Sequence, residues 1–261
     1  MTVTSNILIS HLLVIAGMWL ISLWKKDASI VDRFWGLLFV FLSFAYFIVF
    51  DEINWRTILI LVLVTLWGVR LSLHIHLRNR GHSEDIRYRR MRDEHGASFW
   101  WYSFFSVFLL QGTLALLISA PLYAVFSATS PEYFIWSDAL GLILWTIGFA
   151  FEAGSDWQLK RFKSKPENKG KLLTTGFWAL TRHPNYFGDA CLWWGFYFFA
   201  TGVNFGWVSF IGPATMTIFL RYVSGVSLLE KDLKNSKPGY KNYIENTPAF
   251  FPRLWPQRSS S

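Results

Sequence analysis

Cysteine and charge are both scarce in this chain of 261 residues. Cys191 is the only cysteine, which excludes a disulfide framework and a cysteine-based metal site. Charged residues make up only 16% of the chain, whereas a typical soluble domain has roughly 25%. The dinucleotide-binding motif G-x-G-x-x-G does not occur, so a soluble Rossmann module is excluded. These absences argue against an ordinary soluble protein.

Apolar and aromatic residues are correspondingly abundant. Hydrophobic residues make up 52% of the chain, and its 15 Trp and 25 Phe exceed what a soluble core of this size needs. Trp and Phe at this frequency suit lipid-facing and interfacial positions. The pI of 9.6 would be compatible with nucleic acid binding, but the basic residues occur in short segments between apolar runs. The composition therefore predicts an all-α integral membrane protein that binds no nucleic acid.

Long uncharged runs predict seven transmembrane helices, since a helix needs about 20 mainly apolar residues to cross a bilayer. The first run has no basic n-region and no small-residue cleavage site, so we expect a retained helix and not a signal peptide. The fourth run is longer than one span requires, and we expect Pro121 to bend or end it. The expected spans cover residues 6–24, 34–50, 57–77, 97–128, 140–155, 190–203 and 207–229, with a turn at 201–206.

The charges between the apolar runs predict the orientation. Four segments, 25–33, 78–95, 160–182 and the tail from 231 onward, hold all but three of the 25 basic residues. The intervening loops are acidic, with Arg56 as their only base. Under the positive-inside rule we expect the N-terminus outside and the C-terminus in the cytoplasm. A miscounted helix would break this alternation, which therefore also supports seven spans.

Several ionisable residues lie within or at the ends of the apolar runs. Glu152, Asp156 and Lys160 are spaced four residues apart and share one helix face, and Arg70 and His74 have the same spacing. Ionisable groups at membrane depth are costly, usually face the bundle interior, and are functional candidates by default. The alternative is that Glu152 and Asp156 take part in structural pairs.

The densest polar stretch lies between the expected fifth and sixth spans and reads GFWALTRHPNYFGD at 176–189. This stretch resembles the C-terminal signature of the membrane-embedded steroid 5α-reductase and sterol reductase superfamily. The whole chain is similar to its bacterial branch, which carries a related domain of unknown function (DUF1295-like). Further similar blocks are SIVDRFWG at 29–36, RNRGHSEDIRYRRMR at 78–92, GSDWQLKRFK at 154–163 and YKNYIENTPAFFP at 240–252.

The resemblance implies an enzyme of lipid metabolism. It implies NADPH-dependent reduction of a conjugated carbon–carbon double bond in a lipophilic steroid-like or lipid substrate. One transmembrane domain would cover residues 1–261, with substrate-side helices in 1–128 and the cofactor-binding part in 138–261. The implied location is the bacterial inner membrane, in contact with membrane lipid and with the cofactor site facing the cytoplasm. No metal is expected.

The residue types present suit such a cofactor. Phosphates favour Arg and Lys, and the candidates are Lys160, Lys163, Lys171 and Arg182. Amides, carboxylates and phenols can bind nicotinamide and ribose hydroxyls, and the candidates are Asp156, Asn185, Tyr186, Asp189 and Tyr243.

Further cofactor candidates come from other blocks of the chain. Asn79 and Gly81 lie in an NRG sequence that is similar to the loop that meets the cofactor in steroid reductases. Trp178 either packs in the fold or stacks on the adenine. The remaining candidates are Glu84, Asp85, Arg87, Tyr88, Glu152, His183, Glu230 and Tyr240.

The catalytic proton donor differs from that of the steroid 5α-reductases. Those enzymes polarise the enone oxygen with a Glu of a Gln-Glu pair and with a Tyr, and neither is recognisable here. Asp32 lies at about the place of that Glu, and Trp67-Gly68 near the place of the Tyr. We therefore expect Asp32, protonated by burial, or His74 to be the donor, with Arg70 balancing the charge. The alternative is that Asp32 simply begins a cytoplasmic helix.

Two other functions remain open at this point. Isoprenylcysteine and phospholipid methyltransferases also carry an RHPxY motif between two late membrane helices, where S-adenosylmethionine binds. The Asp that closely follows RHPNY, and the blocks at 78–92 and 154–163, favour the reductase over such a methyltransferase. A non-enzymatic lipid-binding membrane protein is the third possibility. The bound cofactor distinguishes the three.

Overall fold

The computed structural model describes residues 3–223, 225–226, 230 and 239–253. Helix accounts for 79% of these described residues, and they contain no strand, which confirms the predicted all-α class. The helices form two compact units, Met1–Tyr133 with Val203–Ser209, and Phe134–Gly202 with Phe210–Ser261. Each unit is described by itself.

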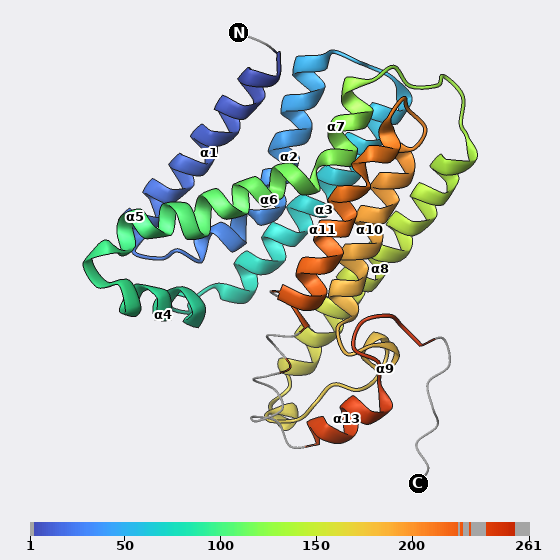
Figure 1. The fold of residues 1–261 in the computed structure, drawn as a ribbon. Helices are drawn as coiled ribbons and strands as arrows, with labels where there is room; N and C mark the ends of the chain where they lie inside the picture. Colours follow the sequence, from blue (N-terminus) through green and yellow to red (C-terminus); the bar gives the residue numbers. More distant parts are fainter. Residues whose placement is uncertain (1–2, 224, 227–229, 231–238, 254–261) are drawn as a thin grey trace. The chain divides into compact units, whose positions relative to one another are not determined.

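Three long helices begin the first unit, namely α1 (Val3–Lys25), α2 (Ile30–Phe50) and α3 (Trp55–Asn79) (Figure 1). They match the first three expected spans, although α2 begins four residues before residue 34. Helices α2 and α3 meet where Gly36 faces Gly68, and a methyl group on Gly68 would lie 2.5 Å from the carbonyl oxygen of Gly36. Only glycine permits the two backbones to approach this closely.

The fourth expected run is divided into shorter helices. Helix α4 (Ile86–His95) precedes it. The run itself contains α5 (Phe99–Ser103), a π-helical stretch (Phe104–Leu109), α6 (Leu110–Ile118) and α7 (Ala120–Ser127). The break falls at Ser119 and places Pro121 in the first turn of α7, where proline is tolerated. The prediction that Pro121 bends or ends this run is therefore confirmed.

Four described segments are long and apolar enough to cross a membrane: Thr4–Lys25, Ile30–Phe50, Trp55–Asn79 and Ile86–Ile118. At most 33% of the apolar window of each is buried within the protein. Large apolar side chains on these helices are consequently exposed, as Trp24 is at 77%. An apolar surface this extensive indicates contact with lipid. The count of seven spans and the orientation of the termini stay predictions.

The second unit contains α8 (Trp136–Lys163), α9 (Phe177–Leu180), α10 (Pro184–Ala200), α11 (Ile211–Ile218) and α13 (Tyr240–Asn246) (Figure 1). Helix α8 continues past residue 155, where the expected span ends, and includes Lys160 as the shared helix face of Glu152, Asp156 and Lys160 requires, because polar but helix-favouring residues follow the apolar run. Helix α10 begins six residues before Ala190, with Pro184 at its first position. The end of the last expected span, at residue 229, lies outside the described residues.

Glycines bring α8 and α10 into close contact. Gly148 on α8 faces Gly188 on α10, and Gly141 faces Gly195 one heptad away on each helix. A methyl group on Gly188 would lie 2.5 Å from the amide nitrogen of Glu152 and 2.5 Å from the carbonyl oxygen of Gly148. This close contact fixes the positions of the polar residues of α8 relative to those of α10.

Candidate functional site

Ten of the predicted site residues lie in two polar clusters, one in each unit. We call the first the Asp32 cluster, consisting of Asp32, Glu84, Asp85, Arg87 and Tyr88. We call the second the Arg182 cluster, consisting of Arg182, His183, Glu230, Tyr240 and Tyr243.

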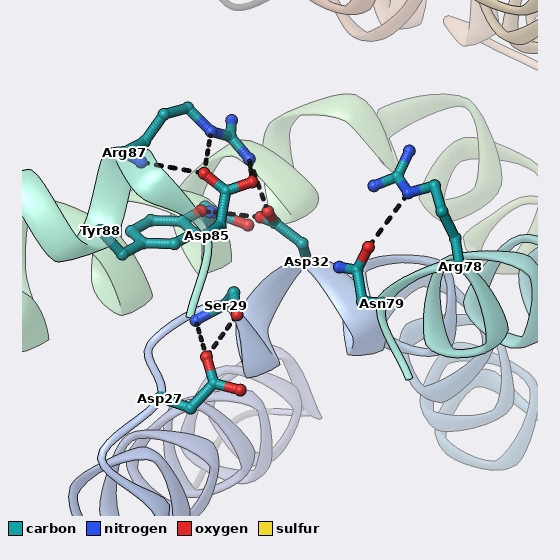
Figure 2. Close-up of polar contacts among 9 residues, drawn as sticks. Asp27, Ser29, Asp32, Arg78, Asn79, Asp85, Arg87 and Tyr88 are labelled. Carbon is teal, nitrogen blue, oxygen red and sulfur yellow. Dashed lines mark hydrogen bonds and ion pairs between the residues drawn. The ribbon is translucent and has the colours of Figure 1, made fainter. Parts of the chain in front are cut away.

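Asp32 lies in the first turn of α2 and binds two donors from α4 (Figure 2). Its Oδ1 accepts a hydrogen bond from the Tyr88 hydroxyl at 2.7 Å, and its Oδ2 accepts one from Arg87 Nη2 at 2.8 Å. Tyr88 is only 6% exposed, and its hydroxyl oxygen accepts from Gln111 Nε2 at 3.1 Å. A buried phenol is therefore held between a carboxylate and an amide.

Asp85 positions this arrangement by capping α4. Its carboxylate accepts from the Arg87 backbone N–H at 3.0 Å and from Arg87 Nε at 2.9 Å (Figure 2). Burial by itself would raise the pKa of Asp85, but the hydrogen bonds and charge of Arg87 outweigh it and hold that pKa below its usual range. Asp85 and Asp32 thus share one guanidinium.

Glu84 joins the α3–α4 loop to the turn between α1 and α2. It forms a bidentate ion pair with Arg92, at 2.8 and 3.0 Å, and accepts the Ala28 backbone N–H at 2.8 Å. In the same turn, Asp27 pairs with Arg33 at 2.7 Å. These contacts hold Asp32 against α4.

The other predicted residues of the first unit lie on or after α3. Arg70 and His74 share one helix face, and both are half-buried and engaged in contacts. Asn79 accepts from Arg78 Nε at 3.1 Å (Figure 2), and Gly81 is exposed with φ at 78°. Gly81 therefore adopts the left-handed conformation that favours glycine.

Arg182 is 7% exposed and holds the C-terminal part of the second unit in place. Its side chain forms an ion pair with Glu230 at 2.7 Å and donates to the carbonyl oxygens of Ile244, at 3.1 Å, and of Thr247. These carbonyls lie at the end of α13, where cationic donors stabilise a helix. The Arg182 backbone N–H donates to Pro248 O at 2.9 Å. Arg182 therefore has a structural role in this conformation.

His183 also contacts the Glu230 carboxylate that pairs with Arg182. His183 Nε2 lies 3.3 Å from Glu230 Oε1, and its ring stacks parallel to Tyr186. Burial by itself would raise the pKa of Glu230, but its hydrogen bonds to His183 and Arg182 and their charges lower it below the usual range. Burial, chiefly, raises the pKa of Tyr240 to about 12.

These contacts predict that acid releases the C-terminal segment 239–253. A carboxylate whose pKa is depressed on folding stabilises the fold above its unfolded pKa of about 4.3 and loses that contribution as the pH falls through its folded value. We expect amide hydrogen exchange of residues 239–253, corrected for intrinsic rates, to rise as the pH falls below about 4.

The Glu230→Gln variant is the control for this prediction. It leaves Arg182 buried without its anion, which costs about 3 kcal/mol, so segment 239–253 should already be poorly protected at neutral pH. Equal protection in the variant and the parent protein at neutral pH would contradict the prediction.

The residues on α8 and α10 form a buried polar row beside their glycine contact. Glu152, Asp156 and Asp189 are 2%, 7% and 8% exposed, and Asn185 Nδ2 donates to Asp156 Oδ1 at 3.3 Å. Lys160 continues the row but is exposed. Glu152, Asp156 and Lys160 thus share one face of α8, as expected. That face is buried at Glu152 and Asp156 and exposed at Lys160, near the C-terminal end of the helix.

Trp178 is held at both ends. Its indole N–H donates to Ser155 O at 3.2 Å, and its carbonyl oxygen accepts from the Tyr243 hydroxyl. Packing in the fold accounts for Trp178 in this conformation. Lys163 and Lys171 are both exposed.

Some residues that shape the clusters gave no motif in the sequence. Gln111, which binds Tyr88, was visible only as an amide inside an uncharged run. Thr181 donates to Phe250 O at 3.0 Å, and Gln158 accepts the Phe177 N–H at 3.1 Å. The heptad spacing of the glycines on α8 and α10 was a readable signal for close helix packing.

Comparison with known proteins gives one family and several partial relatives. The family profile described as "Protein of unknown function (DUF1295)" matches residues 18–247. The chain is 27% identical, over 276 aligned positions, to the uncharacterized protein C594.04c of Schizosaccharomyces pombe, covering 91% of this chain and 76% of that protein. No solved structure matches.

Two shorter similarities name an activity. Over 109 residues the chain is 28% identical to a Delta(14)-sterol reductase of Ascobolus immersus, covering 37% of this chain and 23% of the reductase. Over 48 residues it is 44% identical to the probable O-methyltransferase ustE of Ustilaginoidea virens, covering 18% of this chain and 17% of that protein.

Proposed function

Because the chain belongs to the DUF1295 family and part of it is similar to a sterol reductase, we propose that it is a membrane reductase that uses NADPH. Its substrate is a lipophilic steroid-like or lipid molecule with a conjugated carbon–carbon double bond. The structural observation that carries the proposal is the buried Tyr88 phenol hydrogen-bonded to Asp32. Such a pair can hold and move a proton.

The proton-handling residues come from the first unit. Asp32 accepts hydrogen bonds from both Tyr88 and Arg87, so a proton passing between Asp32 and Tyr88 stays within one hydrogen bond. In the proposal the Tyr88 hydroxyl exchanges its hydrogen bond with Asp32 for one to the substrate, stabilises the oxyanion that develops there and transfers its proton, which solvent then replaces. His74 is the second candidate donor, and Arg70 balances its charge.

The cofactor-binding residues proposed for the second unit suit a dinucleotide chemically. Exposed Lys160, Lys163 and Lys171 provide cations for phosphate, and the Asn185 amide provides a donor and an acceptor for nicotinamide or ribose. When bound, NADPH supplies the hydride. The donors of Arg182 already bind Glu230 and carbonyl oxygens. Arg182 can bind a phosphate of the cofactor only if it releases these partners.

The remaining cofactor candidates come from both units. In the proposal each keeps the role expected from the sequence: Asn79, Gly81, Glu84, Asp85, Arg87, Glu152, Asp156, Trp178, His183, Tyr186, Asp189, Glu230, Tyr240 and Tyr243.

Nucleotide titration tests the proposal and separates it from its alternative. We expect purified protein in detergent to bind NADPH about tenfold or more tightly than NADH, because lysines bind the additional 2′-phosphate through charge-assisted hydrogen bonds. The measurement is isothermal titration with NADPH, NADH and S-adenosylmethionine.

Asn185→Ala should weaken NADPH binding, whereas Asn204→Ala, at an exposed residue of the turn that follows α10, should not. Tight binding of S-adenosylmethionine without NADPH would favour the methyltransferase that the similarity to ustE suggests. Binding of neither ligand by folded protein would favour a non-enzymatic lipid-binding role.

A further inference from the structure

The outward face of α8 changes in chemical character along its length. Ile143, Ile147 and Ala150 are exposed, followed by Trp157 at 58% exposure and by exposed Arg161. Spacings of three, four and seven residues place all five on one side of the helix. The face therefore runs from aliphatic through aromatic to basic.

The opposite face of α8 is covered by protein. Gly141 and Gly148 contact α10 there, and Glu152 and Asp156 are buried. The side that carries Trp157 and Arg161 is thus largely left for lipid or solvent, with Phe177 of α9 packed against it at Gly154.

The order of side chains on the outward face matches the layers of a bilayer. Aliphatic groups suit the hydrocarbon core, Trp suits the interface, and Arg or Lys beyond it meets lipid phosphates. The Arg161 guanidinium lies 5.3 Å from the centre of the Trp157 ring. A cation stacked on an exposed indole is suited to a site where one end is apolar and the other is charged.

The chain after α8 adds charge of one sign. Residues 160–171 contain six bases, all exposed, and Glu167 as their only acid. The Asn168 side chain donates to Phe162 O at 2.9 Å and folds this segment back onto the end of α8. Lys165 and Lys169 are thereby kept next to the last turn of the helix.

The helix dipole accounts for only part of this pattern. Cations in the last turn of α8 are stabilised by its C-terminal carbonyl groups. The dipole explains neither the exposed Trp157 nor bases beyond the helix end such as Lys169, because its effect falls off within one turn.

We propose that Trp157, Arg161, Lys165 and Lys169 form a binding surface for the headgroups of anionic phospholipids. The indole lies at the interface of the bilayer, and the three cations contact the phosphate and glycerol groups of those lipids. This surface is independent of the reductase proposal, because none of its residues is assigned to proton transfer or to the cofactor.

Reconstitution tests the surface. Full-length protein is placed in nanodiscs of phosphatidylcholine alone, or of equal parts phosphatidylcholine and phosphatidylglycerol. The phosphatidylglycerol retained per protein is then measured by native mass spectrometry. We expect the preference for phosphatidylglycerol to fall on the order of tenfold to a hundredfold in the triple variant Arg161→Gln/Lys165→Gln/Lys169→Gln.

The matched control removes three exposed bases of the first unit, Arg80→Gln/Arg89→Gln/Arg90→Gln, and should keep the preference of the parent protein. Equal retention by the triple variant and the parent would overturn the proposal, as would equal losses in both triple variants. Displacement of the retained lipid by glycerol 3-phosphate in solution would also overturn it, since the site would then bind soluble anions.

Discussion

Gly188→Ala is expected to lower the midpoint of thermal unfolding of the detergent-solubilised protein by roughly 10 °C. Alanine normally favours a helix over glycine by up to about 1 kcal/mol. At Gly188, however, the added methyl group would meet the Glu152 amide nitrogen and the Gly148 carbonyl oxygen, both at 2.5 Å. Both partners are helix backbone, which cannot rotate away as a side chain can.

The cost of this substitution follows from moving α10 away from α8. Overpacking a well-packed contact typically costs 1–3 kcal/mol, occasionally more, and we expect a net loss of about 3 kcal/mol because backbone atoms are displaced. The separation would also weaken the Asn185–Asp156 hydrogen bond, already 3.3 Å long. Binding to the residues proposed for the cofactor should therefore fall together with stability.

Gly17→Ala is the matched control, because it makes the same change in α1 where no atom lies within 4 Å of the added methyl group. It should leave the midpoint unchanged or raise it slightly. The double variant Gly148→Ala/Gly188→Ala should cost less than the sum of the single variants, since one separation of the helices relieves both clashes. An unchanged midpoint in Gly188→Ala would show that α8 and α10 do not pack this closely.

Asp32→Asn is expected to reduce turnover at least about a hundredfold while NADPH affinity stays unchanged. The substitution keeps the size of the side chain but removes the negative charge that binds Tyr88 and Arg87 at 2.7 and 2.8 Å. Tyr88 then loses the base with which it shares a proton, and Arg87 keeps Asp85 as its partner. The measurement is NADPH oxidation with a panel of enones, sterols and unsaturated lipids, with affinity titrated in parallel.

Asp27→Asn is the control for this loss of turnover. Asp27 lies in the turn just before α2 and pairs with Arg33 at 2.7 Å and with Ser29, so its loss perturbs the same region. We expect it to retain most of the turnover. His74→Phe tests the second candidate donor in the same assay.

Two results would contradict the role given to Asp32. Full activity of Asp32→Asn would show that Asp32 takes no part in proton transfer. Comparable losses of NADPH affinity and turnover would show that Asp32 instead holds α2 against α4. Loss of activity in His74→Phe alone would transfer the role to His74.

The helices were predictable from the sequence because their causes are local. A run of apolar residues predicts a helix of membrane length, and proline restricts where a helix can continue, as the break before Pro121 shows. The start of α10 was misplaced because the apolar run begins only at Ala190, whereas the polar residues before it are helical as well. Lys160 and Asn185 are polar and nevertheless helical.

The sequence by itself determined the all-α class, the apolar character and the polar segments that hold the candidate site. Which candidates meet was decided by tertiary structure alone. Asp32 and Tyr88 are separated by 56 positions and share one hydrogen bond, and Arg182 and Glu230 by 48 positions and form one ion pair. No local preference encodes such pairs. Arg182 looked like a phosphate ligand in the sequence, but folding placed it 7% exposed against Glu230 and the end of α13, because a buried guanidinium requires an anion and carbonyl acceptors around it.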